Sequence, residues 1–237
     1  MPRYDYVLFD ADNTLFDFDL AERKALRRAL EEHGYPFDDV TESLYLAINR
    51  ALWHRFDLGT IGREELLRER FAVFSHVMGG QDDPLEFNRC YLDHLAEGND
   101  LLPGAEELCA ALAPCCTLAI VTNGVASAQR GRFSRSPLPP YFSGLFISEE
   151  LGCQKPQARF FELVLRAMDI RSPERAVVVG DNLLSDIQGG INAGLDTVWY
   201  NPHSLPNATA VHPTWEVHDF DALRALLLGD PIIPETR

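Results

Sequence analysis

Residues 6–14 read Tyr-Val-Leu-Phe-Asp-Ala-Asp-Asn-Thr, and they indicate the class of fold more directly than any other part of the chain. The apolar run at residues 6–9 is typical of a short strand that is buried on both faces. Asp10 and Asp12 follow at the point where this strand ends. A strand of this kind belongs to a parallel sheet that helices cover on both sides.

The next stretch, from residue 16 to about residue 98, predicts helices and no strand. Apolar residues recur at helical spacing and predict helices over residues 19–33, near residues 44–52 and near residues 66–74. Asp83 followed by Pro84 is a good N-cap and first-turn pair for a fourth helix.

Strands and helices alternate after Pro103-Gly104. We expect strands at residues 118–121, 145–147, 176–179 and 197–199. We expect helices at residues 105–113, 126–133, 156–168, 185–193 and 223–228, with Pro156 opening the third of them. The final residues, PIIPETR, are expected to form a loose tail.

This order of elements predicts an α/β fold, namely a doubly wound parallel-sheet (Rossmann-like) core with an inserted α-helical cap domain. The core is expected to comprise residues 1–15 and 99–237, and the cap residues 16–98.

Composition limits the classes of partner. The chain has 237 residues and a formal charge of −15, which repels nucleic-acid backbones and anionic membranes. No run approaches the ~18 apolar residues of a membrane span, and acidic residues come too early for a signal peptide. The five cysteines show no zinc-binding spacing and are expected to be free thiols. Because free thiols are typical of a reducing compartment, we expect a cytoplasmic protein. We expect it to be a monomer or a homodimer.

Polar clusters lie at the ends of several predicted strands or directly before a helix. They are Asp10 with Asp12, Thr122-Asn123-Gly124, Lys155, and Asp181 with Asp186. Because the carboxyl ends of parallel strands line one crevice, we expect these clusters to converge.

The chemistry of the converged cluster follows from its charge. The carboxylates of Asp10, Asp12, Asp181 and Asp186 would repel one another unless a cation lay between them. Oxygen-only ligands favour Mg²⁺, which commonly bridges to a substrate phosphate. Thr122, Asn123 and Lys155 are therefore the candidate phosphate-binding residues.

A carboxylate at a strand end can attack a phosphoryl group and form an acyl phosphate. Asp10 is the candidate nucleophile. Asp12 can protonate the leaving oxygen and then activate water. These residues predict a phosphatase that hydrolyses a small phosphate monoester.

The motifs DADNT, VTNG, QKP and GDNLLSD together resemble those of the haloacid dehalogenase-like hydrolase superfamily. The resemblance implies that Asp10 is the nucleophile, that Asp12 is the acid/base and that Thr122 and Lys155 bind phosphate. It implies that Asp181 and the backbone carbonyl of Asp12 ligate Mg²⁺, with Asp186 as a ligand or its support. It also implies that the helical insert closes over the site.

The stretches DADNTLFDF, TNGVASAQRGRF and GDNLLSDIQGGINAGLDTVWYN resemble bacterial pyrimidine 5′-nucleotidases that act on noncanonical nucleotides. The resemblance implies that the substrate is a nucleoside monophosphate. Another sugar or metabolite phosphatase and a phosphomutase remain open as alternatives, and a non-catalytic binding scaffold is a remote one.

Overall fold

Strand β1 (Tyr6–Phe9) lies between β2 (Thr117–Thr122) and β4 (Ala176–Gly180) in a computed structural model that describes residues 2–229. Both neighbours run parallel to β1, and Phe9 pairs with Ile120 on one side and Val179 on the other. The sheet is completed by β3 (Phe142–Ile147), β5 (Asp196–Tyr200) and β6 (Trp215–Val217). The predicted parallel α/β sheet is therefore confirmed.

The strand order is β3-β2-β1-β4-β5-β6, so the direction of winding reverses between β1 and β4. In doubly wound sheets, ligands bind outside the carboxyl ends of the strands where the order reverses. Asp10 follows β1 and Asp181 follows β4, so both residues lie at this position.

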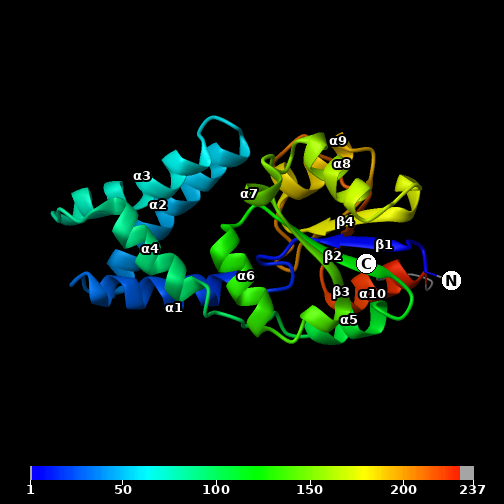
Figure 1. The fold of residues 1–237 in the computed structure, drawn as a ribbon, viewed down its shortest axis with the longest axis horizontal. Coiled ribbons are helices and arrows are strands. Elements are labelled where there is room, and N and C mark those ends of the chain that lie inside the picture. The colour runs from blue at the N-terminus through cyan, green and yellow to red at the C-terminus, as the bar shows by residue number, and fades with distance from the viewer. Residues whose placement is uncertain (1, 230–237) are drawn as a thin grey trace. The chain divides into compact units, whose positions relative to one another are not determined.

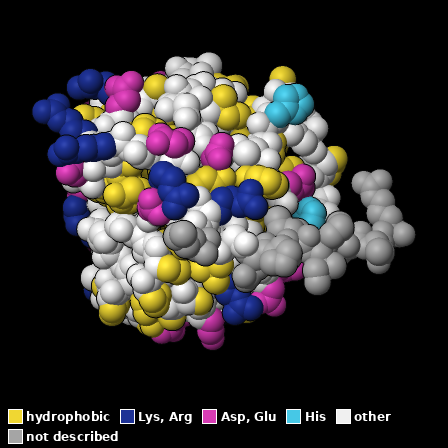
Figure 2. All heavy atoms as spheres, turned by 90° about the vertical axis from the view of Figure 1, so that its right-hand side faces the viewer, with side chains coloured by type: hydrophobic (Ala, Val, Ile, Leu, Met, Phe, Trp, Pro, Cys, Tyr) yellow, Lys and Arg dark blue, Asp and Glu magenta, His cyan; other side chains and the backbone are white. Residues whose placement is uncertain are grey.

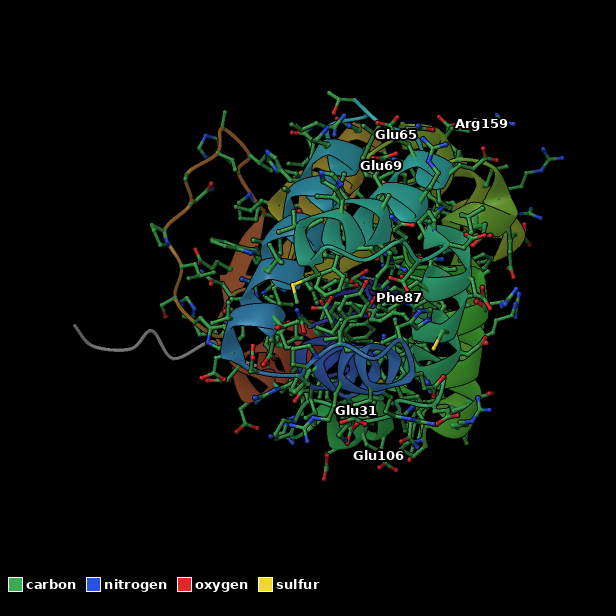
Figure 3. The ribbon with its side chains drawn as sticks, turned by 90° about the vertical axis from the view of Figure 1, so that its left-hand side faces the viewer. Glu31, Glu65, Glu69, Phe87, Glu106 and Arg159 are labelled. Atoms are coloured by element: carbon green, nitrogen blue, oxygen red, sulfur yellow. The ribbon has the colours of Figure 1, made fainter. Side chains whose placement is uncertain are left out.

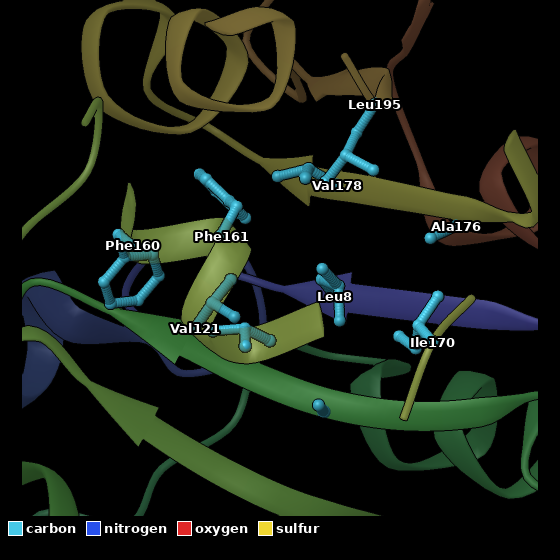
Figure 4. Packing of buried hydrophobic residues seen from close by; sticks show 10 residues of the cluster. Leu8, Val121, Phe160, Phe161, Ile170, Ala176, Val178 and Leu195 are labelled. Atoms are coloured by element: carbon cyan, nitrogen blue, oxygen red, sulfur yellow. The ribbon is translucent and has the colours of Figure 1, made fainter. Parts of the chain in front are cut away.

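Helices cover both faces of the sheet (Figure 1). Helices α8 (Ala158–Ala167) and α9 (Gln188–Asn192) lie on one face, and α5 (Ala105–Leu112) and α10 (Phe220–Leu228) on the other. Phe160 and Phe161 of α8 pack into a buried cluster with Leu8 and Val178 (Figure 4). Because helices cover both faces in this way, the central strands are apolar on both faces.

The chain forms two compact units. The α/β unit is Met1–Asp17, Leu101–Ala126 and Ser136–Arg237, of which the structure describes residues 2–17, 101–126 and 136–229. The helical unit is Phe18–Asp100 and Ser127–Arg135. It contains α1 (Phe18–Glu32), α2 (Asp39–Asp57), α3 (Arg63–Met78), α4 (Pro84–Leu95) and most of α6 (Ala126–Arg135).

The segment that leaves the α/β unit after β1 is paired with the segment that returns to it before α5. Phe16 and Leu101 form an antiparallel bridge, and the backbone N–H of Leu102 donates to the carbonyl of Leu15 at 2.9 Å. The chain therefore leaves the α/β unit and returns to it at adjacent points.

Aromatic side chains form much of the core of the helical unit. Phe87 of α4 stacks on Phe71 of α3 with ring centroids 4.3 Å apart, and Figure 3 shows Phe87 among the side chains between these helices. The predicted start of α4 is confirmed, because the Asp83 carboxylate caps the helix and Pro84 is its first residue.

Several local features differ from the sequence-based expectations. Helix α8 begins at Ala158 and not at Pro156, because residues 154–157 form a hydrogen-bonded turn with a cis Lys155–Pro156 bond. The helix expected from residue 185 starts as a π-helical turn, Leu183–Ile187, which continues into α9. The three-residue strand β6 was not predicted, because it is too short to show a period.

Two remaining sequence predictions concern the C-terminal tail and membrane-spanning helices. The tail at residues 231–237 lies outside the described residues. None of the helices within residues 2–229 combines the length and the apolar character that crossing a membrane demands. Figure 2 shows one face of the molecule, on whose described part basic and acidic side chains are interspersed.

Candidate active site

Lys155 is the central cation of the candidate site and is 1% exposed. Its Nζ donates hydrogen bonds to Asp10 Oδ1 at 2.5 Å, to Asp186 Oδ1 at 2.6 Å and to the Val121 carbonyl at 2.8 Å. Burial lowers the pKa of Lys155, but the two carboxylates outweigh it and hold the pKa above its usual value. Lys155 is therefore charged, and the three hydrogens of its ammonium are all engaged.

The backbone of Lys155 is held by the side chain of Asn123. Asn123 Nδ2 donates to the Lys155 carbonyl at 2.9 Å, and the Lys155 N–H donates to Asn123 Oδ1 at 3.0 Å. Asn123 directly follows β2, so the sheet fixes the position of Lys155, which lies in a loop. The sequence predicted Asn123 as a phosphate-binding residue, and this stays a prediction.

Asp10, Asp181 and Asp186 form a compact carboxylate group. One oxygen from each lies within 4.8 Å of the others. Burial raises the pKa of Asp10 to about 8, opposed by Lys155 and reinforced by the neighbouring carboxylates. Burial and the charge of Asp10 also raise the pKa of Asp181 well above its usual range. Full ionisation of the three carboxyl groups would therefore leave more negative charge than the single ammonium of Lys155 can balance.

The unbalanced charge of the ionised group and its oxygen-only donor set fit a hard divalent cation. A divalent cation would stabilise the ionised carboxylates and displace their protons on binding. The predicted metal ligands Asp10, Asp181 and Asp186 therefore lie together, at the strand ends where the sequence analysis expected them to converge.

Asp186 is fixed by contacts on both of its oxygens. Oδ1 accepts from Lys155, and Oδ2 accepts from the backbone N–H of Asn182 at 3.1 Å. Asn182 Oδ1 in turn accepts from Leu184 N and Ser185 N, which shapes the π-helical turn. A β-carbon on Gly180 would overlap with the Asp186 side chain, so a glycine is required there.

Asp12 lies two residues beyond the strand end and is half-buried. Its carboxylate is not one of the three grouped oxygens among the described residues. The next residue, Asn13, has φ of 57°, a left-handed conformation that asparagine tolerates better than most residues. The chain therefore turns directly after Asp12. Metal ligation by the Asp12 carbonyl stays a prediction.

Thr122 is the last residue of β2 and is buried. Its Oγ1 accepts a hydrogen bond from the Gly124 N–H at 3.0 Å. Because the hydroxyl oxygen accepts this bond, its own hydrogen can be donated to a substrate oxygen.

The model of the haloacid dehalogenase-like hydrolase family matches residues 4–194, which include every residue of this site. The chain is a haloacid dehalogenase-like hydrolase. Hydrolases of this family generally use a divalent metal, which agrees with the carboxylate group described above.

Several curated members of the family are similar over nearly their full length. The pyrimidine 5′-nucleotidase PynA of Streptococcus pneumoniae is 41% identical over 93% of this chain and 93% of its own. The pyrimidine 5′-nucleotidase YjjG of Escherichia coli is 35% identical over 95% of this chain and 98% of its own.

Solved structures of family members share the fold. The HAD-hydrolase YfnB of Bacillus subtilis, bound to magnesium, superimposes with a TM-score of 0.91 at 37% identity. The match covers 95% of this chain and 99% of that one, and that structure reveals interdomain movement. An L-2-haloacid dehalogenase of Xanthobacter autotrophicus, 20% identical over 95% of this chain and 99% of its own, has a TM-score of 0.75 and shows the fold alone.

Sequence reasoning missed the supporting groups of this haloacid dehalogenase-like site. It missed that Asn123 and the Val121 carbonyl hold Lys155, and that Asn182 holds Asp186. The Gly180-Asp181 pair was an available signal, because a glycine beside a candidate ligand often permits close approach of another group.

Proposed function

We propose that this chain is a Mg²⁺-dependent nucleoside 5′-monophosphatase, acting on pyrimidine nucleotides through an aspartyl-phosphate on Asp10. The observation that carries the proposal is the contact of Lys155 with Asp10 and Asp186 beside the carboxylate group. The two relatives named pyrimidine 5′-nucleotidases support the substrate class.

In the first chemical step, a carboxylate oxygen of Asp10 attacks the phosphorus, and the bond from phosphorus to the ester oxygen breaks. Asp12 gives its proton to the leaving oxygen, which departs as the nucleoside hydroxyl. In the second step, Asp12 accepts a proton from water. The resulting nucleophile attacks the phosphorus, which releases phosphate and restores the Asp10 carboxylate.

The phosphate oxygens carry the charge of the transition state, so fixed positive groups supply much of the catalysis. Lys155 provides a buried ammonium, and the Thr122 hydroxyl provides a donor at the end of β2. Because Asn123 holds the Lys155 backbone, little reorganisation is needed when substrate binds.

The carboxylates of Asp10, Asp181 and Asp186, with the backbone carbonyl of Asp12, would hold Mg²⁺. When bound, Mg²⁺ neutralises phosphate charge and allows two anions to approach each other. Oxygen donors select it over softer metals.

The helical insert, residues 16–98 in the sequence-based division, is proposed to act as a cap that excludes water and selects the substrate. The partner is a small phosphorylated metabolite and not nucleic acid or membrane, consistent with the charge of −15. We also infer a cytoplasmic monomer or homodimer, and the five free cysteines are consistent with a reducing compartment.

A phosphate-release assay tests the proposal. UMP, dUMP and dTMP should release phosphate only with Mg²⁺, and Asp10→Asn should abolish the release. Asp169→Asn is the matched control, because this carboxylate lies on the surface with 78% of its side chain exposed.

The outcomes separate the alternatives. If only sugar phosphates release phosphate, the assignment of nucleotides as substrates is overturned, whereas the proposed mechanism still holds. Phosphoryl transfer between sugar positions without release would indicate a mutase. No turnover of any phosphate ester and no Mg²⁺ binding would indicate a binding scaffold.

A further inference from the structure

A thiol, an imidazole and a carboxylate meet where α1 packs against α4 in the helical unit. Cys90 and His94 lie one helical turn apart on α4, and Glu32 is the last residue of α1. Cys90 Sγ donates to Glu32 Oε2 at 3.2 Å, and His94 Nε2 lies 2.8 Å from Glu32 Oε1. One donor atom from each residue lies within 4.8 Å of the others.

We propose that Glu32, Cys90 and His94 form a binding site for Zn²⁺ or a similar borderline-soft metal ion. Neighbouring ligand atoms around tetrahedral Zn²⁺ are about 3.3–3.6 Å apart, given bond lengths of about 2.0–2.3 Å. The Glu32 oxygens lie 3.2 Å from Cys90 Sγ and 2.8 Å from His94 Nε2, and one donor atom from each residue lies within 4.8 Å of the others, so side-chain rotations can bring the three onto one ion. A fourth position remains for water.

The donor set distinguishes this site from the candidate active site. Sulfur and nitrogen ligands favour zinc and related metals, whereas the oxygen-only group at Asp10 favours Mg²⁺. None of the cluster's three residues belongs to the proposed catalytic machinery. The two sites should therefore bind different ions from a mixture.

The surroundings of the cluster admit a cation. A cavity of about 420 Å³ adjoins the three ligands and is also lined by Glu86 and Asp93. The Glu32 side chain is 58% exposed, which leaves a route for the ion, while the His94 side chain is 10% exposed.

The nearby positive charges are engaged with other carboxylates. Arg28 pairs with Glu97, and Arg89 lies 3.8 Å from Glu86. His33 also lines the cavity, but its Nδ1 pairs with Asp82 at 3.0 Å and its ring stacks on Phe87. These pairings reduce the electrostatic opposition to a bound cation.

When a metal ion binds, bonds to the ion replace the contacts that Glu32 makes with Cys90 and His94. The Cys90 S–H bond breaks, its proton leaves to solvent, and a bond from sulfur to metal forms. His94 releases to solvent the Nε2 hydrogen that faces Glu32, takes up a hydrogen on Nδ1, and binds the ion through Nε2 as neutral imidazole. The bound ion then links the last turn of α1 to α4 and stabilises the helical unit.

Cobalt substitution tests the site in the full-length protein. Co²⁺ is added to metal-stripped protein in the presence of excess Mg²⁺, which occupies oxygen-only sites. Absorption from a thiolate-to-cobalt charge transfer should appear, and Zn²⁺ should quench it by displacement. Cys90→Ser should abolish this absorption, and His94→Gln should weaken Zn²⁺ affinity more than about tenfold in competition with a chromogenic chelator.

Cys115→Ser is the matched control, because Cys115 is an exposed thiol of the α/β unit. It should keep both the absorption and the affinity. Circular dichroism of each metal-free variant verifies folding, and Zn²⁺ should raise the melting temperature of the wild type but not of Cys90→Ser. Absence of the charge-transfer band in the wild type, or its persistence in Cys90→Ser, would overturn the proposal.

Discussion

The side-chain amide of Asn123 forms hydrogen bonds to both the N–H and the carbonyl of Lys155, at 3.0 and 2.9 Å. These two bonds connect the end of β2 to the loop that carries Lys155, whose ammonium contacts Asp10. The position of the ammonium therefore depends on a neutral side chain.

Asn123→Ala should reduce kcat at least tenfold and lower the free energy of unfolding by about 2 kcal/mol, because it leaves buried backbone groups of Lys155 unsatisfied. Steady-state kinetics and denaturant titration measure both effects. Asn192→Ala is the control, since Asn192 is exposed, donates a hydrogen bond to the Pro156 carbonyl and accepts one from Gln188 Nε2, and is not among the described hydrogen-bond partners of Lys155 itself. Equal effects of the two substitutions would contradict the positioning role.

Lys155→Met should abolish turnover and destabilise the metal-free protein by about 3–5 kcal/mol, because it leaves buried carboxylates without their cation. Adding Asp186→Asn should restore part of the stability and none of the activity. A double-mutant cycle in denaturant measures the coupling between Lys155 and Asp186. Additive losses in this cycle would show that the 2.6 Å contact contributes no stability.

Gly180→Ala should displace Asp186, because the new methyl group overlaps with the buried Asp186 side chain. We expect a loss of about 1–3 kcal/mol in stability and a rise in the Mg²⁺ concentration needed for half-maximal activity. Gly62→Ala is the control, since a β-carbon there meets no atom within 4 Å. Unchanged Mg²⁺ dependence in Gly180→Ala would contradict the idea that Asp186 needs this glycine.

Glu22 of the helical unit provides a pH test. Burial raises its pKa from 4.5 to about 7, although Arg70 and a 2.7 Å hydrogen bond from Asn49 favour the charged form. Because the folded state holds the proton more tightly, the resulting stabilisation is complete below pH 4.5 and is lost as pH rises to about 7.

Glu22→Gln mimics the protonated form, so it should match the wild type near pH 4.5 and exceed its stability near pH 8 by up to about 3 kcal/mol. Denaturant titrations at several pH values measure the difference. If Glu22→Gln is instead the less stable protein at pH 8, then ionised Glu22 is stabilised by Arg70 and the assigned direction is wrong.

Much of the fold could be predicted because it depends on local patterns. The apolar strands were visible as short runs, and the convergence of Asp10, Lys155 and Asp181 followed from the geometry of parallel strands. The cap of α4 was visible because Asp83 and Pro84 act within one turn.

Other features depend on contacts that no local pattern encodes. Strand β6 exists because Trp215 to Val217 pair with β5, and α8 starts late because a turn precedes it. The contact between Glu32 and Cys90 joins positions 58 residues apart and requires the packing of two helices. The cysteines show no zinc-binding spacing in the sequence, because the third donor of this cluster lies on another helix.

The bridge between Phe16 and Leu101 has a consequence for protein engineering. Since the chain enters and leaves the helical insert at neighbouring points, a replacement module whose own ends lie close together can be joined there if it also packs on Ser127–Arg135 of the helical unit. Inserts from other chains can thus be exchanged without changing the register of β1, and such chimaeras offer a direct route to new substrate preferences.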